Sequence, residues 1–164
     1  MTLEENKRVV RRFSEELFGT GNLQLLDEII APHAVHTAST SNWEPGREGF
    51  RKHVLWIHNA LPDIHLTVED LIAEGEQVVA FWAIRGTHQG EFWGVQPTGR
   101  PVVITAVIRL QVINGQVYHC QFLPDRLGIL IQLGSLGRHT EQFAQAPTTS
   151  CRNILAEPTS VADG

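Results

Sequence analysis

An aspartate stands where an apolar strand gives way to an apolar helix. The segment LPDRLGIL at 123–130 places Asp125 at this junction, and Arg126 is the charge nearest to it in sequence. A buried carboxylate must be solvated, paired or kept protonated, because an isolated anion in an apolar interior is too costly. A carboxyl group held in a dry cavity can act as an acid/base catalyst, whereas Asp before an apolar helical run is also a common N-cap. Asp125 is therefore a candidate catalyst, with helix capping as the alternative.

Helical periodicity predicts three helices before residue 62. The first runs from about 3 to 18, after an N-cap at Thr2 with Glu5 three residues on. A second, short helix begins at Asn22 and ends at Pro32, because proline cannot continue it. A third runs from about 47 to 60 and is closed by Pro62.

Two β-hairpins follow, with turns at Glu74-Gly75 and Asn114-Gly115. The first joins strands 63–73 and 76–87, and the second joins strands 102–113 and 116–123. A regular ladder from the second turn sets Ile113 opposite Gln116 and Ile104 opposite Asp125. One face of this hairpin would then be an apolar wall that ends in polar groups: Ile104, Ala106, Ile108, Leu110, Val112, Val117, His119, Gln121, Leu123 and Asp125.

These elements predict an α+β fold in which a curved antiparallel sheet wraps on the N-terminal helices, closes with a helix at 127–133, and encloses a pocket. We expect one domain over 1–134. Residues 135–164 are rich in small and polar residues, so we expect a flexible or loosely packed tail. The other, mixed face of the hairpin suits a sheet-to-sheet contact, and a homo-oligomer, dimer or tetramer, is expected.

Composition limits the possible partners. The 164 residues carry a net charge of −5 with scattered Lys and Arg, so no nucleic-acid partner is expected. No apolar run approaches the length of a membrane span, and the polar start is unlike a signal peptide, so we expect a cytoplasmic protein without a membrane partner. Cys120 and Cys151 are expected to be free thiols.

Four segments carry a family resemblance: GTHQGEFWGVQPTGR at 86–100, INGQV at 113–117, PDRLG at 124–128 and QLG at 132–134. Over about residues 4–134 the chain resembles the SnoaL-like polyketide cyclases of the nuclear transport factor 2-like superfamily. The resemblance implies a cone-shaped α+β barrel around a pocket. It also implies an intramolecular aldol ring closure of a polyketide ester, run without metal or cofactor, with Asp125 as the acid/base group.

One position departs from the family pattern. The wall position matched by Ile108 often carries His or Asp in the family. Either Gln121 and His119 on the facing strand replace this His or Asp as the polar partner of Asp125, or the reaction differs from that of the family. General acid–base help contributes about 10²–10⁴-fold and works best when an apolar site moves the pKa toward the working pH.

Histidines and tryptophans supply the other candidates. The resemblance suggests that His36 donates a hydrogen bond to a small apolar carbonyl ligand, and Trp56 and Trp82 would line the pocket unless they are core. His33 and His36 could join His53, His58 or His65 around a metal ion, but no tight ligand signature appears and no metal site is expected. His88 is expected to fix its own loop by hydrogen bonds.

Two alternatives stay open. The same cavity could belong to a non-catalytic small-molecule binding protein, because fold does not fix function. An epoxide hydrolase would need an Asp-Arg-Asp set, and a ketosteroid-isomerase-like enzyme a Tyr with a carboxyl group. The wall derived above has one carboxylate, no Arg and no Tyr, which disfavours both.

Overall fold

The computed structural model describes residues 1–38 and 41–136. The expected tail lies outside the described residues from 137 onward, as does Cys151. The elements are, in chain order, α1 (Leu3–Arg12), the π-helix η1 (Phe13–Gly19), the 3₁₀ turn η2 (Leu23–Leu25), α2 (Leu26–Ile29), β1 (Ile30–Ala38), β2 (Ser41–Asn42), α3 (Arg47–Ala60), β3 (His65–Glu74), β4 (Gln77–Thr87), β5 (Pro101–Ile113), β6 (Gln116–Pro124) and α4 (Arg126–Leu133).

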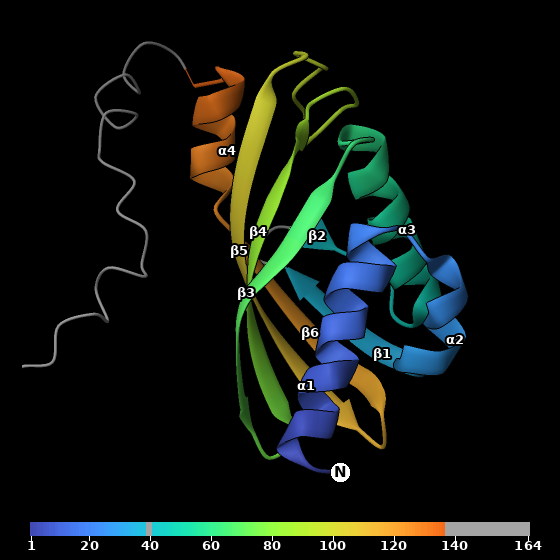
Figure 1. Ribbon diagram of the computed structural model, residues 1–164. Coiled ribbons are helices and arrows are strands. Elements are labelled where there is room, and N and C mark those ends of the chain that lie inside the picture. Colours follow the sequence, from blue (N-terminus) through green and yellow to red (C-terminus); the bar gives the residue numbers. More distant parts are fainter. Residues whose placement is uncertain (39–40, 137–164) are drawn as a thin grey trace, which may run out of the picture.

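The strands form one curved sheet in the order β2-β1-β6-β5-β4-β3, with α1, α2 and α3 on one side and α4 on the other (Figure 1). This confirms the expected α+β class. The sheet is mixed, however, because β1 pairs in parallel with β6. The sequence did not reveal β1, since Pro32 and an irregular register between Ile30 and Val35 interrupt its alternation. The second helix accordingly ends at Ile29.

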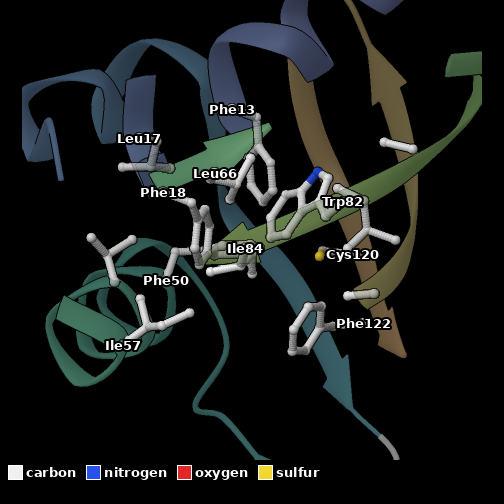
Figure 2. Packing of buried hydrophobic residues seen from close by; sticks show 14 of the residues in the cluster. Phe13, Leu17, Phe18, Phe50, Ile57, Leu66, Trp82, Ile84, Cys120 and Phe122 are labelled. Carbon is white, nitrogen blue, oxygen red and sulfur yellow. The ribbon is translucent and has the colours of Figure 1, made fainter. Parts of the chain in front are cut away.

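Large aromatic side chains fill the space between the helices and the concave face of the sheet (Figure 2). Trp82 of β4 lies at its centre, with ring centroids 6.2 Å from Phe13 and 5.5 Å from Phe18. Its indole Nε1 donates to the Ser14 hydroxyl at 2.9 Å, and that hydroxyl donates to the Val10 carbonyl. Because the indole N–H and the hydroxyl both have hydrogen-bond partners, their burial costs little free energy. The contact therefore fixes η1 on the sheet.

A β-bulge at Tyr118 overturns the expected wall. The ladder begins as expected, with Ile113 opposite Gln116, but after Val112–Val117 the next pair is Gln111–His119. One extra residue in β6 exchanges the faces of everything beyond it. Cys120 and Phe122 therefore point into the core, whereas these side chains lie on the opposite face: His119, Gln121 and Leu123.

The strand-to-helix junction has the geometry of a helix cap. An Asp125 side-chain oxygen accepts the Gly128 backbone N–H at 2.9 Å, and the residue is exposed. Its backbone N–H donates to the Thr105 carbonyl, so the expected pairing with Ile104 was wrong. The Gln132 side chain then bonds both backbone groups of Val103 and seats α4 along the free edge of β5.

Candidate functional site

Two buried histidines, His36 and His53, lie together between β1 and α3. His36 is 4% exposed, because beyond the irregularity in β1 alternate residues face inward and His36 follows Ala34 in that pattern. In the register with β6 it lies beside Cys120, which faces the same interior. The strand therefore presents an imidazole to the aromatic side chains of α3.

His53 approaches His36 from α3. It falls on the same helical face as Phe50 and Ile57, three before and four after it, and is 2% exposed. The two imidazole centroids are 4.7 Å apart with planes 29° apart, and Phe50 stacks on the other histidine, His36, at 4.8 Å. Phe122, on β6 beyond the bulge, meets the His53 ring edge-on at 5.4 Å.

Three ring nitrogens of this histidine pair have no hydrogen-bond partner among the described residues. They are both nitrogens of His36 and Nδ1 of His53. A neutral imidazole has one N–H donor and one acceptor nitrogen, and a buried polar group left unmet costs about 1–3 kcal/mol. Within the described residues, the pair therefore leaves three nitrogens available to a polar group such as a ligand.

Both histidines are held neutral. Burial, helped by repulsion from His119, lowers the pKa of His36 from 6.5 to about 4. Burial, with a smaller contribution from His36, lowers the pKa of His53 well below 6.5. Near pH 7 each ring is therefore a neutral hydrogen-bonding group, of the kind that polarises a carbonyl without donating its proton outright.

This burial makes stability depend on pH. Between pH 6.5 and about 4 the unfolded chain binds a proton at residue 36 that the folded chain does not, so stability falls as pH falls through this window. Each pKa unit is about 1.4 kcal/mol. Urea titrations at pH 7 and pH 4.5 measure the free energy of unfolding that each protein loses on acidification. This loss should be about 2 kcal/mol smaller for His36→Phe than for wild type. Equal losses would contradict a buried neutral His36.

Half-buried tryptophans border the histidine pair. Trp43 stacks on His53 at 4.7 Å and on His36 at 6.0 Å, and Trp56 lies 5.8 Å from His53. The ring centroids of Trp56 and Trp93 are 5.6 Å apart, and the Arg126 guanidinium lies 5.0 Å from the centre of the Trp93 ring. We call these residues the aromatic rim: Trp43, Trp56 and Trp93.

The remaining sequence candidates divide between the rim, the core and the outer face. Trp56 belongs to the rim. Trp82 is core, one ring away from the site, since Phe122 contacts both it and His53. Ile108 is fully buried opposite Phe122. Because of the bulge, His119 and Gln121 cannot serve as the pocket-facing partners expected of them.

Asp125 is exposed and does not lie on the apolar wall, and its neighbour in sequence, Arg126, contacts the rim at Trp93. The expected dry surroundings of its carboxylate were therefore wrong, while its role in catalysis stays a prediction. Sequence reasoning considered His53 only as a metal ligand and missed its pairing with His36. The signal was present, since His53 lies between Phe50 and Ile57 at helical spacing. Trp43, outside any helix or strand, had no such signal.

His88 fixes its loop as expected. Its backbone bonds Arg100 and Gly99, and its Nδ1 accepts the Thr98 backbone N–H at 3.2 Å. Among the described residues no group of three or more His, Cys, Asp or Glu is placed to hold a metal ion. No helix within the same residues is long and apolar enough to cross a membrane.

The sequence matches the family model described as SnoaL-like polyketide cyclase over residues 8–133. The chain belongs to the SnoaL-like polyketide cyclase family. Two curated relatives of this SnoaL-like chain are ester cyclases. Nogalonic acid methyl ester cyclase of Streptomyces nogalater is 29% identical over 119 residues, 71% of this chain and 89% of the relative. Aklanonic acid methyl ester cyclase AcmA of Streptomyces galilaeus is 28% identical over 141 residues, 85% of this chain and 97% of the relative.

Solved structures agree on the fold of this SnoaL-like chain. TsrD from Streptomyces laurentii superimposes with a TM-score of 0.75 at 24% identity, covering 83% of this chain and 99% of TsrD. IdmH from Streptomyces antibioticus superimposes with a TM-score of 0.68 at 31% identity, covering 79% of this chain and 98% of IdmH. These neighbours confirm the cone-shaped α+β fold, and the family as a whole supports a cyclase- or isomerase-type function.

Proposed function

We propose that the chain catalyses a cofactor-free, intramolecular aldol ring closure of a polyketide-type carbonyl compound at the histidine pair. One observation carries this proposal: a neutral, buried His36 has two unpartnered ring nitrogens among aromatic side chains. The names of the two ester cyclases supply the substrate class, the methyl ester of a carboxylic acid. The half-buried rings of the aromatic rim suit an ester whose acid part is flat and conjugated.

The reaction has two proton transfers. A base removes a proton from a carbon that carbonyl groups make acidic, and the resulting enolate carbon forms a bond to a second carbonyl carbon. The electron pair of that C=O moves to its oxygen, which then takes a proton, so the product has the mass of the substrate. A His36 N–H directed at this oxygen would stabilise the charge that develops there, in a site with little water.

Asp125 is the proposed proton acceptor. Its neighbour in sequence, Arg126, contacts the rim at Trp93, and the Asp125 carboxylate has accepting capacity beyond the Gly128 hydrogen bond. Its exposure favours a substrate that extends from His36 to the rim, since a carboxylate in solvent cannot reach the interior. The same exposure is the observation that favours the second candidate, a binding protein without catalysis.

The direct test is turnover of nogalonic or aklanonic acid methyl ester by the purified chain in EDTA. Liquid chromatography with mass detection should show a product of unchanged mass and new retention time, formed at a rate proportional to protein. The alternative predicts a different pair of results: unchanged substrate, together with a higher melting temperature when the ester is present. Turnover that needs an added metal ion or cofactor would contradict the cofactor-free mechanism.

A further inference from the structure

His53 adds a third unpartnered nitrogen to the two of His36. Its ring lies against the His36 ring face to face, with centroids 4.7 Å apart and planes 29° apart. The hydrogen-bonding directions of an imidazole lie in its plane, so two stacked rings cannot satisfy each other. Each ring therefore needs a partner other than its neighbour, and one third body bound at the pair would serve both.

The surroundings of this histidine pair restrict what that body can be. Phe50, Phe122 and Trp43 pack against the two rings, and none of them offers a hydrogen-bond acceptor to the unpartnered nitrogens. Among the described residues no carboxylate bonds either imidazole, so the donors are not committed to a charge within the chain. Neutral donors between apolar walls suit a neutral or charge-delocalised group with two oxygens close together.

We propose that His36 and His53 form a two-point site for the paired oxygens of an enolised 1,3-dicarbonyl. Nδ1–H of His53 donates to one oxygen, and a ring N–H of His36 donates to the other. The apolar walls contact the groups on either side of the dicarbonyl. This deepens the proposed function, since it assigns His53 and names the substrate group that the site holds, and it rests on that function only for the reaction that follows binding.

Two compounds with one carbon skeleton isolate the second oxygen. Dibenzoylmethane is an enolised 1,3-diketone, and 1,3-diphenylpropan-1-one is the same molecule with one carbonyl reduced to CH₂. Quenching of tryptophan fluorescence should give a Kd for the diketone about tenfold below that of the monoketone. Tenfold corresponds to about 1.4 kcal/mol, the net value of one hydrogen bond.

Substitutions at His53 then assign the preference. His53→Phe keeps an aromatic ring in the stack and removes the nitrogens, so the diketone-to-monoketone ratio should fall to about one while the monoketone Kd stays within about threefold. His53→Asn places an amide nitrogen near the position of Nδ1 and should restore part of the ratio. His33→Phe changes an exposed histidine on β1, the strand of His36, and should leave the ratio at the wild-type value.

A diketone preference that survives in His53→Phe would overturn the proposal. Equal affinity of the wild type for both ketones, or binding of neither, would overturn it too, because the nitrogens would then serve a buried water. The ring-closure assay tests the proposed function independently of this site. If turnover is absent while the diketone preference still depends on His53, the proposed function is wrong and the two-point site stands.

Discussion

Replacing His36 by phenylalanine is expected to lower kcat/KM for ring closure by about 10²–10³-fold, the usual cost of losing one donor to a developing oxyanion. The loss should fall mainly on kcat, because the hydrogen bond strengthens as charge appears on the carbonyl oxygen. The variant keeps a ring that can stack on Phe50. It also removes two unpartnered nitrogens, so its melting temperature should be unchanged or higher.

The matched control for this variant is His33→Phe. His33 lies on the same strand but is exposed, so its replacement should leave both kcat/KM and the melting temperature near the wild-type values. Stopped assays of the methyl ester, with thermal unfolding of each variant, give both quantities. A His36→Phe enzyme with wild-type turnover would show that the buried imidazole does not contact the reacting oxygen.

At Asp125, two substitutions separate helix capping from catalysis. Asparagine is as good an N-cap as aspartate, so Asp125→Asn should unfold at the wild-type temperature. Asp125→Ala loses the bond to Gly128 and should cost about 1 kcal/mol of stability. If Asp125 takes the substrate proton, both variants should lose about 10²–10⁴-fold in turnover, irrespective of their stability.

The opposite pattern is also informative for Asp125. Turnover that follows stability, with Asp125→Asn active and Asp125→Ala weakened only near its melting temperature, would show that the carboxylate is a cap alone. His36 would then need another proton acceptor, such as solvent at the aromatic rim. Measuring turnover well below both melting temperatures keeps the two effects apart.

Local patterns were enough for most of the architecture. Helical spacing gave the N-terminal helices and α3, and Asn114-Gly115 gave the β5–β6 hairpin and its first pair, since turn chemistry and periodicity act over a few residues. The family resemblance, and not local patterning, pointed to His36. Local patterning missed β1, because Pro32 and the irregular register hide the alternation of that strand, and its pairing with β6 joins residues over 80 positions apart.

The tertiary structure decided which side chains form the site. A single extra residue at Tyr118 exchanges the faces of β6, so Phe122 enters the interior and Gln121 leaves it. No local rule places that bulge, because it satisfies the packing of the whole sheet. The sequence by itself determined an α+β chain with SnoaL-like segments and a capping aspartate at the β6–α4 junction. Only folding brings His36 of β1 and His53 of α3 to 4.7 Å, since burial against shared aromatic rings acts between residues distant in the chain.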